Sequence, residues 1–120
     1  MSRRPKTLFE KIWEQHVVVP ETHDTPALIY IDLHLIHEVT TPQAFTLLRE
    51  NNLKVRNPKK VLATMDHSTP TVPVASLRDL DIVSEKGPAE QIRDMVKNCN
   101  DFGIELYGFE SDRRGIVHVI

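Results

Sequence analysis

The chain has 120 residues, of which 40% are hydrophobic, 27% are charged and one is cysteine, and its formal net charge is −2 at pH 7. This length fits one domain with a modest core, and the nearly balanced charge gives no electrostatic basis for binding nucleic acid. No apolar run is long enough to span a membrane, and no signal-peptide core follows the first basic residues. A single cysteine excludes an intramolecular disulfide and favours a reducing compartment, which we expect to be the cytoplasm.

The first third of the sequence predicts one helix and two strands. Thr7 and Glu10 have the spacing of a capping box, which predicts a helix that begins at Thr7. Residues 17–19 are a β-branched run that Pro20 stops, so we expect a short strand there. Residues 27–36 predict a longer strand with apolar side chains on both faces, a pattern typical of a strand buried in a parallel sheet.

Helices and strands alternate along the rest of the chain. The Thr-Pro pair at 41–42 is a helix start, and residues 61–65 predict a second buried strand. The Gly-Pro pair at 87–88 begins the clearest helix, because the apolar residues after it recur at helical spacing. Residues 104–109 and 115–120 predict two further strands. This alternation predicts an α/β domain with a mostly parallel sheet.

The chain ends in the apolar, strand-like segment 115–120, with neither a turn nor a polar cap after it. A natural domain seldom ends in a bare apolar strand, because its backbone and side chains need partners. We therefore expect residues 1–120 to be the truncated, N-terminal portion of a longer domain, with no internal domain boundary.

An acid and a histidine, Asp66 and His67, directly follow the predicted strand 61–65. Neighbouring residues on a strand point to opposite faces, so the two can act together only where the strand breaks, here into the polar loop at 68–70. A carboxylate beside an imidazole orients the ring and stabilises its protonated form, which is what a general acid needs. The pair is a candidate proton donor, and the alternative is a solvated pair in a loop.

The other histidines and the cysteine each allow two interpretations. His34 and His37 have the H-x-x-H spacing of a zinc site, but on an extended segment they lie on opposite faces, and no third ligand is spaced for them. His118 lies between two valines, which favours a core histidine. Cys99 falls on the apolar stripe of the predicted helix, which favours a small buried residue over a metal ligand.

Several sequence blocks carry a family resemblance. They are T-L-F-E-K-I-W-E-Q-H, I-Y-I-D-L-H-L-I-H-E-V-T-T-P-Q-A-F, V-L-A-T-M-D-H-S-T-P, V-K-N-C-N-D-F-G-I-E-L and G-I-V-H-V-I, in that order along the chain. Together they resemble the large subunits of the 3-isopropylmalate dehydratases, the leucine-pathway branch of the aconitase family, over nearly the whole chain. The resemblance implies the N-terminal part of an aconitase-type layered α/β domain.

The resemblance also implies a hydro-lyase that interconverts 2-isopropylmalate and 3-isopropylmalate by dehydration and rehydration. Hydroxide is a poor leaving group, so this chemistry needs a Lewis acid on the hydroxyl and a proton donor to the departing oxygen. In the family a 4Fe-4S cluster is the Lewis acid, the Asp-His pair protonates the hydroxyl, and a separate small subunit provides the base. The family's cluster cysteines lie beyond this segment, so we expect no metal ligand in this chain and no activity from it alone.

Two further histidines receive roles from the resemblance. His118 corresponds to an active-site histidine of aconitases, and His37 stands where aconitases carry a substrate-contacting residue, which is a glutamine in aconitase itself. Two other interpretations of the chain remain open. One is a sister enzyme, such as homoaconitase or a methyl-substituted malate dehydratase, and the other is a non-catalytic fragment.

Overall fold

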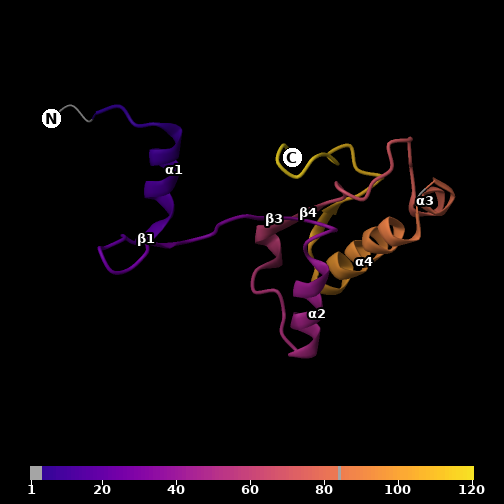
Figure 1. Ribbon diagram of the computed structural model, residues 1–120, viewed down its shortest axis with the longest axis horizontal. Helices are drawn as coiled ribbons and strands as arrows, with labels where there is room; N and C mark the ends of the chain where they lie inside the picture. The colour runs from indigo at the N-terminus through magenta and orange to yellow at the C-terminus, as the bar shows by residue number, and fades with distance from the viewer. Residues whose placement is uncertain (1–3, 84) are drawn as a thin grey trace. The chain divides into compact units, whose positions relative to one another are not determined.

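The computed structural model describes residues 4–83 and 85–120, and the chain divides into two compact units, residues 1–32 and 33–120 (Figure 1). The first unit contains α1 (Leu8–His16), β1 (Val17–Val19) and β2 (Leu28–Ile29). The second contains β3 (His34–His37), α2 (Pro42–Glu50), the 3-10 helix η1 (Pro58–Lys60), β4 (Val61–Thr64), α3 (Leu77–Val83), α4 (Lys86–Phe102) and β5 (Glu105–Tyr107). That both units belong to one domain stays a prediction.

Among the described helices, none combines the length and the apolar character that crossing a membrane requires.

The predicted capping box at the start of α1 is confirmed. The hydroxyl of Thr7 accepts the N–H of Glu10 at 3.2 Å, and the N–H of Thr7 donates to Glu10 Oε2 at 2.8 Å. Thr7 donates two hydrogen bonds to the carboxylate of Glu10, from its backbone N–H and, at 3.1 Å, from its hydroxyl, and these hold the pKa of Glu10 below its ordinary value. No residue of α1 is buried, and its exposed apolar side chains include Leu8, Phe9, Ile12 and Trp13. Within the first unit, α1 is therefore stabilised by its cap and not by a core.

The predicted strand over residues 27–36 is wrong as a single element. β2 pairs antiparallel with β1 in the first unit, whereas β3 pairs in parallel with β4 in the second. The predicted burial on both faces is also wrong, because Ile36 is the one fully buried apolar residue of β3 and the stretch before it is exposed: Tyr30, Ile31 and Leu33. Apolar composition does not show where a chain passes from one set of pairing partners to another.

The second unit is built on a parallel sheet of order β3-β4-β5, which confirms the predicted α/β architecture. In register, His37 of β3 lies beside Thr64 of β4, and Thr64 lies beside Tyr107 of β5, so the carboxyl ends of the strands meet at one edge. The main core cluster joins the sheet to α2 and α4 and consists of Ile36, Phe45, Ala63, Met95, Cys99 and Ile104. A second cluster under α3 and α4 consists of Met65, Val74, Leu80, Ala89 and Ile92.

Both predicted helices of the second unit form. α2 begins at Pro42, and Thr41 takes the N-cap position, although its hydroxyl donates to the carbonyl of His37 at 2.7 Å instead of capping the helix. α4 ends at Phe102, and the φ of 67° at its C-cap Gly103 is the left-handed conformation that glycine adopts readily. α3 forms over residues 77–83, where the sequence favours no particular element.

Residues 115–120 do not form the predicted strand but an irregular segment with one turn at residues 117–119. Their backbone groups pair with side chains at the end of β4: the hydroxyl of Thr64 donates to the carbonyl of Gly115 at 2.9 Å, and the carboxylate of Asp66 accepts the N–H of Val117 at 2.9 Å. These hydrogen bonds occupy backbone groups that would pair with a neighbouring strand if the segment were itself a strand. The apolar, β-branched composition of this segment is therefore not evidence of a strand at this position.

Candidate active site

Asp66 and His67 follow the end of β4, with Met65 alone between the strand and the pair. Asp66 Oδ2 lies 3.3 Å from His67 Nδ1, and the exposed fractions of the two side chains are 10% and 48%. The strand ends at Thr64 and the chain turns at residues 67–68, so the alternation of faces along the strand no longer separates the two residues. The arrangement joins a largely buried acid to a half-exposed imidazole.

The carboxylate of Asp66 is held from a second direction. Its Oδ2 atom also accepts the N–H of Val117 at 2.9 Å, and its backbone carbonyl accepts the hydroxyl of Thr69 at 2.9 Å. A carboxylate with a fixed backbone donor loses much of its rotational freedom. Asp66 can therefore orient the imidazole of His67 through Nδ1, which leaves Nε2 free of this contact.

Glu38 lies beneath the Asp66–His67 turn and is fully buried. It comes directly after β3, the strand next to β4. Its Oε2 atom accepts the N–H of Asp66 at 3.0 Å, and its Oε1 atom accepts the N–H of Ser68. No motif in the sequence assigns a role to Glu38. One signal could have identified Glu38: it is an acid at the carboxyl end of β3, and β3 lies beside β4, the strand that leads to Asp66.

His37 packs against His67. The two rings are stacked, with centroids 4.0 Å apart and planes inclined by 11°. His37 is half-buried, and its Nδ1 atom accepts the N–H of Val39 at 3.4 Å. The structure thus brings His37 to the same strand edge as Asp66 and His67. His34, at the other end of β3, is exposed and takes no part in this cluster.

His118 is exposed and lies in the turn at residues 117–119. Its neighbour Val117 contacts Asp66 through the backbone, so the segment reaches the site. Over residues 4–83 and 85–120, no hydrogen bond or ring contact joins His118 itself to Asp66 or His67. The structure does not bear out a core histidine, and the role of His118 in the site stays a prediction.

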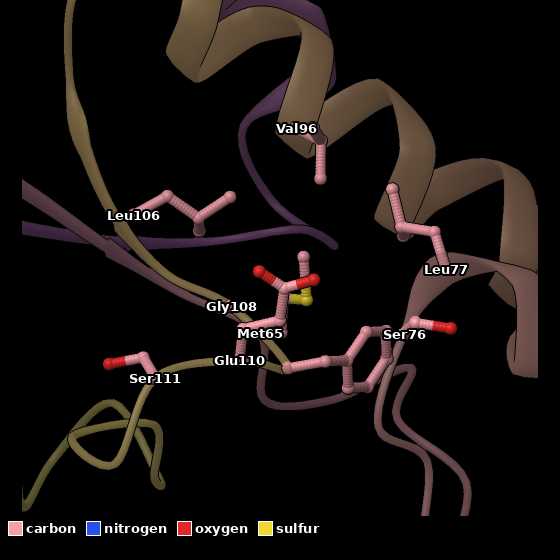
Figure 2. A pocket seen from close by; sticks show the side chains of 9 residues that line it. Met65, Ser76, Leu77, Val96, Leu106, Gly108, Glu110 and Ser111 are labelled. Atoms are coloured by element: carbon pink, nitrogen blue, oxygen red, sulfur yellow. The ribbon is translucent and has the colours of Figure 1, made fainter.

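A pocket of about 430 Å³ is lined by Met65, the residue before Asp66 (Figure 2). Figure 2 shows the sulfur of Met65 at its centre, with Leu106 and Leu77 on opposite sides and Val96 above. None of the four candidate site residues lines it. This pocket is therefore mainly apolar and separate from the imidazole of His67.

The described residues do not fit an iron–sulfur cluster. Within this part of the chain, no group of three or more His, Cys, Asp or Glu side chains is placed to hold a metal ion. Cys99 is 2% exposed, and burial raises the pKa of its thiol to about 12, so the thiol stays protonated at neutral pH. Clusters bind thiolates. The burial of Cys99 in the main core cluster confirms its interpretation as a small core residue.

Comparison with known proteins connects this arrangement to a family. Residues 10–120 match the family described as Aconitase family (aconitate hydratase). The 3-isopropylmalate dehydratase large subunit of Roseiflexus castenholzii is 58% identical over 116 residues, and that of Anaeromyxobacter dehalogenans is 53% identical over 116 residues. Each match covers 97% of this chain and 24% of the relative.

The same subunit of Oenococcus oeni is 53% identical over 115 residues, again with 24% of the relative covered. The chain thus spans about a quarter of the length of these curated relatives. No solved structure matches it at a significant level. Because the family match extends over nearly all of the sequence, the chain belongs to the aconitase family.

Proposed function

We propose that the chain is part of the large subunit of a 3-isopropylmalate dehydratase, a cytoplasmic hydro-lyase that interconverts 2-isopropylmalate and 3-isopropylmalate in leucine biosynthesis. Identities of 51–58% to large subunits of that name support the assignment. The observation that carries it is the 3.3 Å contact between Asp66 and His67 at the carboxyl end of a parallel strand. In open α/β sheets, ligands bind outside the carboxyl ends of the strands.

In this proposal His67 is the proton donor to the departing hydroxyl. Asp66 lies against Nδ1 of the imidazole, so Nε2 is the nitrogen that gives its proton to the hydroxyl oxygen. In the hydration direction the same nitrogen accepts a proton from water, because a reversible reaction passes through the same transition state. The carboxylate of Asp66 keeps the ring in one orientation through its contact with Nδ1.

His37 and His118 complete the proposed site. The ring of His37 covers one face of the His67 ring, which shields that face from water and leaves the edge of His67 for the substrate. We assign His37 a contact with the substrate on this ground and on the family resemblance. His118 is proposed to reach the same site in the complete enzyme, since its neighbour Val117 already contacts Asp66.

The remaining parts of the machinery are proposed to lie outside the described residues. The complete enzyme would hold its 4Fe-4S cluster on ligands that this part of the chain does not provide, and a small subunit would supply the base that removes the carbon-bound proton. The contribution of residues 37–118 is then proton transfer to the leaving hydroxyl and positioning of the substrate.

The test is a substrate comparison with the complete large subunit, its small subunit and a loaded cluster. We expect the highest kcat/KM for 2-isopropylmalate, with weaker turnover of homocitrate and of methyl-substituted malates. A higher kcat/KM for one of these others would replace the substrate assignment by a sister enzyme of the family. No turnover of any of them by an enzyme with intact cluster absorbance would contradict the hydro-lyase proposal itself.

A further inference from the structure

Glu38 is an unusual group to find fully buried, because removing a carboxylate from water is costly unless other groups replace its solvation. No lysine, arginine or histidine forms an ion pair with it in the described ranges 4–83 and 85–120. Instead, each of its two oxygens accepts one backbone N–H, at 3.0 Å in the case of Asp66. Both carboxylate oxygens of Glu38 therefore bind N–H groups of one short backbone segment, residues 66–68.

The two N–H groups belong to Asp66 and Ser68, the residues on either side of His67. A carboxylate that accepts both fixes the direction of the backbone from which the imidazole projects. Glu38 also directly follows His37, whose ring stacks on that of His67. Two consecutive residues at the end of β3 therefore act on His67: Glu38 holds its backbone, and His37 covers one face of its ring.

We propose that Glu38 is a positioning residue for His67: its buried carboxylate binds the N–H groups of Asp66 and Ser68 and so aligns the imidazole with the substrate. This inference rests on the proposed role of His67 as proton donor. The alternative is that Glu38 only satisfies buried N–H groups and supports the fold. The two differ in what a variant changes, since a folding residue acts on stability and a positioning residue acts on turnover in enzyme that is folded.

Glu38→Gln in the complete enzyme, with its small subunit and a loaded cluster, separates these possibilities. The amide keeps the shape but has one acceptor oxygen, so its NH2 group faces one of the two N–H donors and the turn must shift. A shift of about 1 Å at a reacting group lowers turnover on the order of a hundredfold, so we expect that fall in kcat with KM changed less than about threefold. Glu38→Asp keeps both oxygens on a shorter arm and should give an intermediate kcat.

Ile36→Ala is the matched control for stability. Ile36 is buried on the same strand, two residues before Glu38, and belongs to the main core cluster and not to the His67 turn. Its truncation should lower the unfolding midpoint while leaving the kcat of the folded enzyme unchanged. If Glu38→Gln does not fold, Glu38→Asp measured against Ile36→Ala decides the question.

A double-mutant cycle with His67→Asn shows whether Glu38 acts through His67. We expect Glu38→Gln to lower kcat further by less than about threefold once His67 is replaced, because the imidazole it positions is gone. An unchanged kcat in Glu38→Gln alone, or the same large fall in both backgrounds, would overturn the inference and leave the role of His67 intact. Normal turnover in His67→Asn alone would instead overturn the proposed function, and the inference with it.

Discussion

Two Asp-His pairs lie in the described part of the chain, one in each unit, and they differ in how the acid is held. In the first unit, His16 Nε2 lies 3.1 Å from Asp32 Oδ2, and Asp32 is 57% exposed. In the second, the contact is 3.3 Å long, but Asp66 is largely buried and also binds the N–H of Val117. The separation of acid and imidazole is nearly the same in both pairs, so distance does not distinguish a surface pair from a candidate site. The two pairs are distinguished by the burial of the acid.

Replacing the acid of each pair should separate them most clearly. Asp66→Asn should lower kcat by about tenfold to a hundredfold, because the amide oxygen still accepts the N–H of Val117 but a neutral amide holds the imidazole of His67 less firmly than a carboxylate. Asp32→Asn should leave kcat within about twofold, as exposed ion pairs contribute little. Steady-state assays of both variants in the complete enzyme check this. Equal activity of the two variants would remove the distinction between the pairs.

A Cys99→Ser variant tests whether Cys99 is only a packing residue of the core or also a ligand of the cluster. Cys99→Ser should leave the cluster's visible absorbance unchanged and lower the free energy of unfolding by about 1–3 kcal/mol, because a hydroxyl would be buried in the main core cluster. Chemical denaturation measures the loss. A folded variant that no longer shows the cluster absorbance would mean that Cys99 is a ligand.

The same thiol predicts a dependence of stability on pH. Its pKa is raised from 9.0 to about 12 by burial, so above pH 9 the unfolded chain releases a proton that the folded chain retains. The contribution is fully present below pH 9 and is lost as the pH rises toward 12. Denaturation curves of the parent and Cys99→Ser should therefore converge over this range. A constant difference between them would contradict the raised pKa.

The smallest expected effect is on His16. Its pKa is raised above the ordinary 6.5, first by the hydrogen bond of Nδ1 with the carbonyl of Ile12 and then by Asp32. The stability that protonated His16 adds to the folded state is therefore fully present below pH 6.5 and is lost as the pH rises through the raised pKa of His16. NMR titration should show a lower pKa for His16 in Asp32→Asn, but still above the ordinary value. An unchanged pKa would show that Asp32 contributes nothing.

The sequence predicts the elements whose signals are local. The capping box of Thr7 and Glu10, the start of α2 at Pro42 and the break after residues 61–65 each depend on a few adjacent residues, and all three form. The meeting of Asp66 and His67 follows from that break. Neighbouring residues thus carry enough information for the acid–imidazole contact of the site.

The remaining features depend on partners that are distant in sequence. Residues 115–120 look like a strand, but the side chains of Thr64 and Asp66 bind their backbone groups. Glu38 gives no local sign of its role, because its partners are backbone N–H groups 28 and 30 residues away. Backbone groups are the same in every residue, so no motif in the sequence marks them as the targets of a buried carboxylate.

The central claim is that His67, and not simply an Asp-His pair, donates the proton. The most direct measurement is kcat of His67→Ala beside His16→Ala in the complete enzyme, with cluster absorbance confirmed in both. We predict a fall of about two to four orders of magnitude for His67→Ala, the usual effect of removing a positioned proton donor, and a change within about twofold for His16→Ala. Near-normal turnover by His67→Ala with an intact cluster would contradict the assignment.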